Sequence, residues 1–129
     1  MIVIWVRHGE YEFEEDGELT REGKKEIERT AKQLRVRLLH KRNILILSSP
    51  KKRAVQSAEI IFKELSKTRK SIAMKIDERL DVDGDGIWVD DIEKEFSEAK
   101  IVILVTHLPI IEDCYGGYLP KGGWAVEEI

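Results

Sequence analysis

The stretch Ile2-Val-Ile-Trp-Val-Arg-His-Gly9, near the start of the chain, decides the fold class. Its apolar residues, within a strand expected at residues 2–7, follow one another without alternation and are rich in β-branched side chains. Such runs are typical of strands buried on both faces of a parallel sheet. Similar runs predict strands at residues 44–48 and 101–106. Further strands are predicted at residues 71–76 and 124–129.

Helix-like segments alternate with these strands. Thr20 is a good N-cap, and apolar residues recur from there at helical spacing to about Leu39. Ser49 followed by Pro50 predicts a second helix, with the serine as N-cap and the proline at the first helical position. Shorter helices are predicted at residues 91–99 and from Pro109. The alternation predicts an α/β fold, a three-layer sandwich with a mostly parallel central sheet flanked by helices.

Length and composition narrow the class of protein. The 129 residues suit one domain, and the net charge of -3 gives no electrostatic footprint for nucleic acid. No apolar run approaches the roughly 20 residues that cross a bilayer, and no secretory signal opens the chain. A single cysteine, Cys114, excludes an internal disulfide and suits a reducing cytoplasm. We therefore expect one domain over residues 1–129, cytoplasmic, with neither a nucleic-acid nor a membrane partner.

Two histidines follow predicted strands. His8 ends the first run, and His107 follows the run at residues 101–106. Arg53 lies just past the second strand, in the first turn of its helix, where its side chain should point back over the helix N-terminus. Ligands of parallel α/β sheets bind beyond the carboxyl ends of the strands, so we expect these residues to converge.

The convergence indicates chemistry on a phosphoryl group. A helix N-terminus offers unpaired N–H groups to an anion, and the planar forks of Arg7 and Arg53 match phosphoryl oxygens. Both arginines would hold the pKa of His8 down and keep the imidazole neutral and nucleophilic. His107 would donate to an oxygen of the transferred group.

The same residues carry a resemblance to a known family, the histidine phosphatase (phosphoglycerate mutase-like) superfamily. Four of its motifs occur in order across nearly the whole chain: Arg7-His8-Gly9-Glu10, Leu19-Thr20-Arg21-Glu22-Gly23, Ser49-Pro50-Lys51-Lys52-Arg53-Ala54 and Thr106-His107-Leu108-Pro109. Four independent motifs in register are a specific signal. The short chain and the His-Leu-Pro motif look most like the SixA-type phosphohistidine phosphatases.

This resemblance implies a metal-independent phosphatase without an inserted cap domain or a cofactor. His8 would accept the phosphoryl group, and Arg7, Arg53, His107 and Ser49 would form the phosphate pocket. The substrate would be a phosphorylated protein or a small phosphorylated molecule. A small-molecule phosphomonoesterase or mutase-like enzyme is the alternative, and a phosphate-binding module without turnover is a further one.

The sequence does not assign the residue that acts as the general acid. Family members that act on metabolites carry a glutamate two residues after a leucine that follows the third strand, and counting from Leu80 this position holds Val82. Asp81, Asp83 and Asp85 lie nearby and are the candidates. Residues 81–86 also match the first six positions of an EF-hand loop, but position 12 is Ile92 rather than glutamate, so no calcium site is expected.

The remaining conspicuous residues have structural interpretations. His40 is expected at the surface near a helix end, and Lys51 and Lys52 in a solvated first turn. Trp5, Phe62 and Phe96 are expected in the core, and Cys114 is expected to have no catalytic role, because the signature of cysteine phosphatases is missing.

Overall fold

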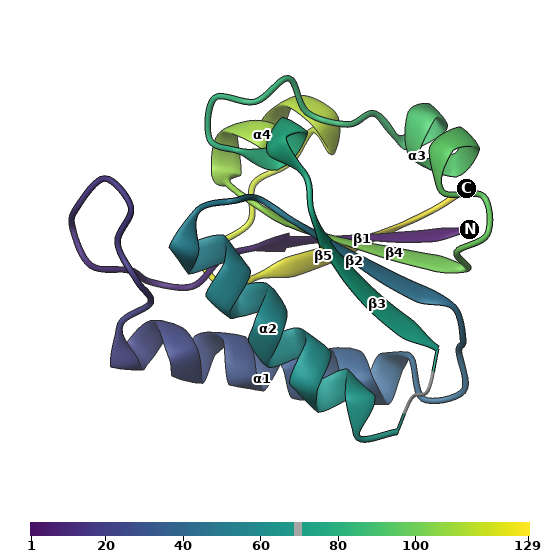
Figure 1. Cartoon of the computed structure of the whole chain (residues 1–129), viewed down its shortest axis with the longest axis horizontal. Helices are drawn as coiled ribbons and strands as arrows, with labels where there is room; N and C mark the ends of the chain where they lie inside the picture. Colours follow the sequence, from purple (N-terminus) through teal and green to yellow (C-terminus); the bar gives the residue numbers. More distant parts are fainter. Residues whose placement is uncertain (69–70) are drawn as a thin grey trace.

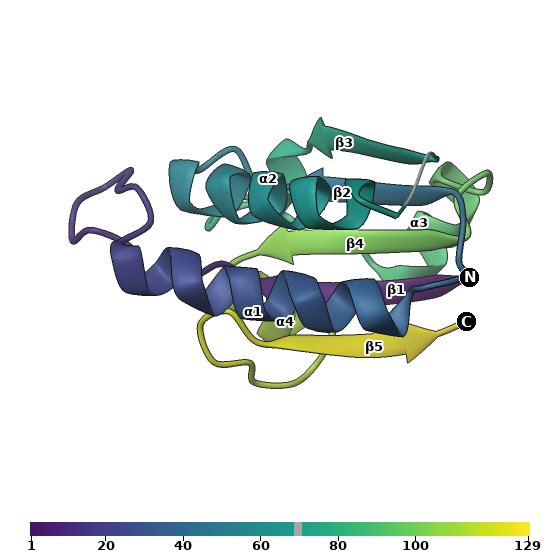
Figure 2. The same cartoon turned by 90° about the horizontal axis from the view of Figure 1, so that it is seen from below.

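The strands form one five-stranded sheet in the computed structural model, which describes residues 1–68 and 71–129. In chain order they are β1 (Ile2–Arg7), β2 (Ile44–Ser48), β3 (Ile72–Ile76), β4 (Ile101–Thr106) and β5 (Trp124–Glu128). Their order across the sheet is β3-β2-β4-β1-β5. Four strands are parallel, and β5 pairs antiparallel with β1 at one edge (Figure 2). The predicted mostly parallel sheet is confirmed.

Helices cover both faces of the sheet. α1 (Arg21–Arg37) and α2 (Lys52–Ser66) lie together on one face, and α3 (Val89–Glu95) and α4 (Leu108–Cys114) lie on the other with the 3-10 turn η1 (Glu78–Leu80) (Figure 1). The predicted α/β sandwich of three layers is therefore the observed architecture. No described helix is both long and apolar enough to cross a membrane.

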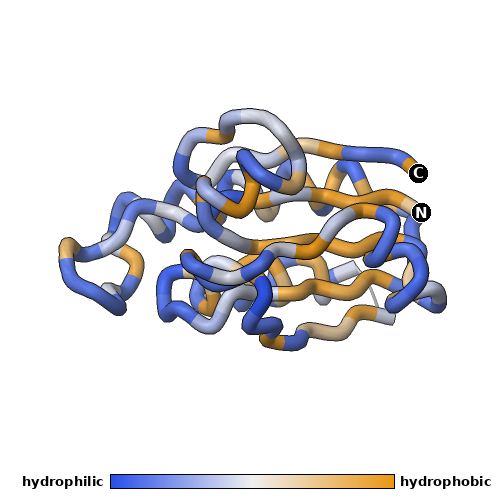
Figure 3. Tube along the Cα trace, turned by 90° about the horizontal axis from the view of Figure 1, so that it is seen from above, coloured by the Kyte–Doolittle hydropathy of each residue, from blue (hydrophilic) through white to orange (hydrophobic). Residues whose placement is uncertain are grey.

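Alternate residues of each central strand enter different cores. Ile4 and Val6 of β1 pack under α1 and α2, while Val3 and Trp5 pack toward α3 and α4. All four are fully buried, which explains why β1 is apolar from Ile2 to Val6, up to the arginine that ends it. Figure 3 shows the same distribution, with hydrophobic strands inside a hydrophilic periphery.

Several predicted boundaries differ from the structure. The second helix begins at Lys52, not at Pro50, and Ser49 does not cap it. α1 ends at Arg37, two residues before the predicted end, and α3 covers Val89–Glu95 rather than residues 91–99. Phe62 and Phe96 are half-buried at the margins of the two cores, because β3 is an edge strand with partly exposed faces.

The register of the sheet aligns the ends of three strands. Arg7 of β1 pairs with Thr106 of β4, and Ser48 of β2 pairs with Val105. The residues that come next in each strand therefore emerge at the same edge. The segment 10–18 extends from this edge beyond α1 and α2 (Figure 1).

Candidate active site

The two histidines meet at this edge. His8 follows β1 and His107 follows β4, and their ring centroids are 5.0 Å apart. The His8 N–H donates to the Thr106 carbonyl at 3.2 Å, which continues the β1–β4 pairing into the site. Both side chains are buried. The expected convergence of these two residues is thus observed.

His8 has a defined tautomer. Its Nδ1 lies 2.8 Å from the carbonyl oxygen of Gly9, an atom that can only accept, so Nδ1 carries the proton. Burial is the main reason that the pKa of His8 falls to about 4. The bond to Gly9 opposes this shift, and the charges of Arg53, Arg7 and Lys121 add to it in that order. Desolvation thus dominates, and the arginines expected to control this pKa are secondary. The neutral ring keeps a lone pair on Nε2.

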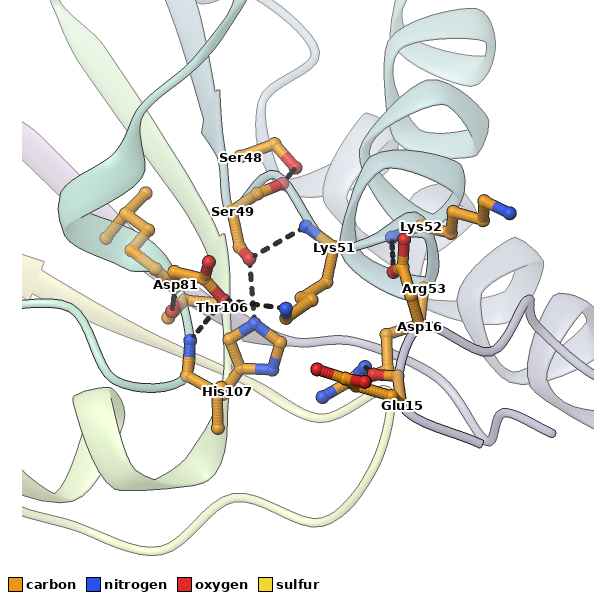
Figure 4. A network of polar contacts seen from close by, with 12 residues as sticks. Glu15, Asp16, Ser48, Ser49, Lys51, Lys52, Arg53, Asp81, Thr106 and His107 are labelled. Carbon is orange, nitrogen blue, oxygen red and sulfur yellow. Dashed lines mark hydrogen bonds and ion pairs between the residues drawn. The ribbon is translucent and has the colours of Figure 1, made fainter. Parts of the chain in front are cut away.

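His107 is bonded through its other nitrogen. Its Nε2 lies 2.7 Å from Ser49 Oγ, and the Lys51 backbone N–H donates to the same oxygen at 3.2 Å. Burial is the main reason that the pKa of His107 falls to about 3, followed by the charges of His8, Arg53, Lys51 and Arg7. Nδ1 of His107 is buried and has no hydrogen-bond partner. Figure 4 shows the link between Ser49 and His107.

Two arginines reach the same space with unused donors. Arg53 is buried and donates from Nη1 to the Glu15 carbonyl at 3.4 Å, and Arg7 donates from Nη1 to the Leu119 carbonyl at 3.1 Å. The Nε atoms of both arginines are buried without a partner. An unsatisfied buried polar group costs about 1–3 kcal/mol, so these donors suit a ligand rich in acceptor oxygens.

The N-terminus of α2 differs from expectation. The Lys51 N–H is taken by Ser49 Oγ, and the Lys52 N–H donates to Asp16 Oδ1 at 2.8 Å. Asp16, from the segment 10–18, therefore occupies a donor that was expected to face phosphate. Arginine side chains, rather than these two N–H groups, supply the donors that remain unpaired.

The three candidate aspartates are not equivalent. Asp81 is half-buried, its Oδ1 accepts from the Val82 N–H at 2.7 Å, and the same oxygen lies 3.9 Å from Lys51 Nζ (Figure 4). Asp83 and Asp85 are exposed. Of the three, Asp81 is the one joined to the residues around His107.

Two residues near the histidines, Tyr11 and Lys121, were not singled out from the sequence. The Tyr11 ring meets His8 edge-on at 5.3 Å, and the Arg53 Cζ lies 4.2 Å from its centroid. Lys121 Nζ contacts Glu10 Oε2 at 2.8 Å and lies 5.6 Å from the Tyr11 centroid. Tyr11 directly follows the Arg7-His8-Gly9-Glu10 motif, so its place in the sequence could have pointed to it. Lys121 is far away in the sequence and has none.

The family model of the histidine phosphatase superfamily (branch 1) matches residues 3–100. The chain belongs to this superfamily. Membership supports a phosphatase enzyme, and the match includes His8 and Arg53. His107 lies beyond it, and the pairing of β1 with β4 places this histidine beside His8.

Several solved structures share the fold of this chain. A protein histidine phosphatase SixA complexed with tungstate is 19% identical, with a TM-score of 0.76, over 99% of this chain and 95% of that chain. A protein from Agrobacterium tumefaciens that carries the SixA name is 19% identical, with a TM-score of 0.69, over 97% and 86%. A mycobacterial glucosyl-3-phosphoglycerate phosphatase is 14% identical, with a TM-score of 0.75, over 97% and 88%. A comparison with curated proteins gave no match.

Proposed function

We propose that this chain is a phosphatase that transfers a phosphoryl group from its substrate to His8 and then to water, and that its substrate is a phosphohistidine, as in SixA-type enzymes. The carrying observation is the hydrogen bond between His8 Nδ1 and the Gly9 carbonyl. It holds the proton on Nδ1, and it leaves Nε2 as the nucleophilic atom of a ring that is neutral at pH 7.

The neighbouring donors fit the charge that develops on the phosphoryl oxygens. Arg7 and Arg53 each have a buried Nε without a partner, and a guanidinium fork binds such oxygens in pairs. Ser49 Oγ accepts from Lys51, so its own proton is free to go to His107 Nε2. His107 then carries its proton on Nδ1, the atom that lacks a partner, and donates it to a phosphoryl oxygen.

The reaction has two displacements. His8 Nε2 attacks phosphorus, the bond from phosphorus to the substrate nitrogen breaks, and the leaving imidazole keeps the electron pair and takes a proton from solvent. Water then attacks the phosphorus on His8, the bond to Nε2 breaks, and the water proton passes to solvent. Gly9 accepts from Nδ1–H throughout, which stabilises the cationic phosphorylated ring.

The substrate class follows from what surrounds the histidines. Within the described residues no carboxylate forms a hydrogen bond or ion pair with His8 or His107, and Asp81 is already engaged with Val82 and Lys51. An alkoxide leaving group needs a positioned acid because of its high proton affinity. Imidazole leaves more easily, which favours phosphohistidine over alkyl phosphates.

The charged residues around the two histidines also favour phosphohistidine as the substrate. Lys51 faces Asp81, and Lys121 pairs with Glu10, so neither lysine is left for a second anionic group of a substrate. The exposed carboxylates Glu12, Glu14 and Glu15 add negative charge beside the site. Small polyanions are repelled by such a field at low salt, whereas a phosphohistidine on a protein is repelled less, because its surroundings neutralise part of its charge.

A comparison of kcat/KM tests this substrate class. The substrates are a protein phosphorylated on histidine with phosphoramidate, 4-nitrophenyl phosphate and 3-phosphoglycerate. We expect efficiency to fall in this order. If 3-phosphoglycerate is the best substrate, the phosphohistidine proposal fails. Loss of that activity in Asp81→Asn but not in Asp83→Asn would then identify a phosphomonoesterase with Asp81 as the acid.

Trapping of the phosphorylated enzyme tests the role of His8 separately. Wild-type protein quenched during turnover should gain the mass of one phosphoryl group on His8, in an adduct that is lost in acid. His8→Ala should gain none. A phosphate-binding module would bind the phosphorylated protein without forming this adduct in either variant.

A further inference from the structure

Tyr11 lies among the charged and ionisable groups of the site. The Arg53 Cζ is 4.2 Å from the centroid of its ring, the His8 imidazole meets it edge-on at 5.3 Å, and Lys121 Nζ is 5.6 Å away. The side chain is half-buried. A cation within about 6 Å of an aromatic face is attracted to it, so the ring holds two cations beside His8.

The position of this ring is fixed relative to the helix that carries Arg53. Tyr11 forms an isolated β-bridge with Leu19, a buried residue. The Leu19 N–H in turn donates to Gln56 Oε1, on α2, at 2.7 Å. One short chain of contacts therefore ties the backbone of Tyr11 to α2, three residues from Arg53.

Arg53 has few other contacts that would hold it. Its Nη1 makes a long bond to the Glu15 carbonyl, and its Nε has no partner. Among the described residues no carboxylate pairs with it. A ring against the flat face of a guanidinium restrains it while leaving the N–H edges available, whereas a carboxylate would occupy those edges.

We propose that Tyr11 is a positioning residue, whose ring holds the face of the Arg53 guanidinium so that its N–H edges bind phosphoryl oxygens, and which shields His8 from water. This inference rests on the proposed function, because it takes Arg53 as a phosphate ligand and His8 as the nucleophile. The ring, not the hydroxyl, performs this role.

The shielding has a consequence that a purely structural residue would not have. Burial is the largest cause of the low pKa of His8, and the charges facing it are those of Arg53, Arg7 and Lys121, with the His107 ring alongside. Removing the ring admits water and frees Arg53 to move away. Both changes raise the pKa of His8 toward its ordinary value, so the acid limb of kcat/KM moves to higher pH.

The test compares variants at two neighbouring aromatic residues. Tyr11→Leu and Tyr11→Gln remove the ring, Tyr11→Phe keeps it, and Phe13→Leu is the matched control, because Phe13 is fully exposed in the same loop. The first measurement is the Kd for inorganic phosphate by calorimetry, which needs no turnover. The second is the pH profile of kcat/KM on 4-nitrophenyl phosphate, with the thermal midpoint recorded for each variant.

We expect Tyr11→Leu and Tyr11→Gln to weaken phosphate binding about tenfold, the scale of a desolvated cation–π contact, and to move the acid limb upward. Tyr11→Phe should restore both quantities, and Phe13→Leu should change neither. Wild-type phosphate affinity in a folded ringless variant overturns the proposal, as does a Tyr11→Phe variant as weak as Tyr11→Leu. Because Kd is read without catalysis, these results are separate from a failure of His8 as nucleophile.

Discussion

The centre of the pocket and the loops that surround it are built in different ways. At the centre, His8 and His107 directly follow paired strands, and both side chains are almost fully buried. Around it, the segments 10–18 and 81–86 are irregular, and each sends some residues inward and others into solvent. Tyr11 faces His8, but Phe13 is fully exposed two residues later.

This difference shows what fixes a functional side chain. A residue next to a ladder of strand hydrogen bonds has its position set by the register, so its role can be inferred from a motif. In a loop, composition alone does not tell which residue turns inward. Asp81 joins Lys51 near His107, while Asp83 and Asp85, with the same chemistry, are exposed.

The largest effect is expected at the centre. His8→Ala should lower kcat/KM by more than about 10³-fold, because a nucleophile makes its bond only in the reaction and nothing replaces it. The matched control is His40→Ala, at an exposed position after α1, which should keep wild-type activity. Steady-state kinetics on 4-nitrophenyl phosphate measures both variants. More than a few per cent of wild-type activity in a folded His8→Ala would contradict the assignment.

The next effect separates two neighbours on α2. Arg53→Ala should lower kcat/KM about 10²–10³-fold, because it removes a charged donor from a desolvated phosphate site, and Arg7→Ala should act similarly. Lys52→Ala should have little effect, because Lys52 contacts Asp16 through its backbone and exposes its side chain. The measurement is kcat/KM with circular dichroism to confirm folding. Equal losses in Arg53→Ala and Lys52→Ala would mean that general positive charge, not a placed fork, binds the substrate.

The contrast between residues next to paired strands and residues in loops also explains which features of the fold and the site could be predicted from the sequence. The strands agree with their predicted bounds within one residue, and continuous apolar runs explain this agreement for β1, β2 and β4. His8 and His107 meet, and Arg53 lies against the Tyr11 ring beside His8, so these residues converge as their motifs indicate. The predicted start of α2 was wrong, because Ser49 bonds His107 and is not the N-cap of the helix. Asp16, from a distant loop, takes the helix N–H. Such long-range choices follow from the fold and leave no local pattern.

Acid stability should report the burial of the central histidines. The pKa values of His8 and His107 fall from 6.5 to about 4 and about 3, so between these limits the unfolded chain binds protons that the folded chain does not. The free energy of unfolding is thus fully maintained above pH 6.5 and decreases as pH falls through this window. The slope is at most about 1.4 kcal/mol per pH unit for each histidine.

Urea unfolding at several pH values between 7 and 4 measures this slope. The double variant His8→Asn, His107→Asn removes both titrations and should give a flatter dependence than the wild type. Equal slopes would mean that the carboxylates around the pocket, such as Glu10 and its Lys121 partner, control the acid response instead.

The smallest effect on activity is expected from a metal chelator, and this expectation concerns the loop at residues 81–86. The segment 81–86 resembles the start of a calcium loop, yet Asp81 is engaged with Val82 and Lys51, and Asp83 and Asp85 are exposed. Within residues 1–68 and 71–129, no group of three or more His, Cys, Asp or Glu side chains is placed to hold a metal ion. The charges that face the phosphoryl oxygens in the proposed mechanism are those of arginines. EDTA should therefore leave kcat and KM unchanged, and added calcium or magnesium should not raise them. If EDTA abolishes activity and either ion restores it, the aspartates of this loop must rearrange around the cation, and the loop would then belong to the catalytic centre rather than to its surroundings.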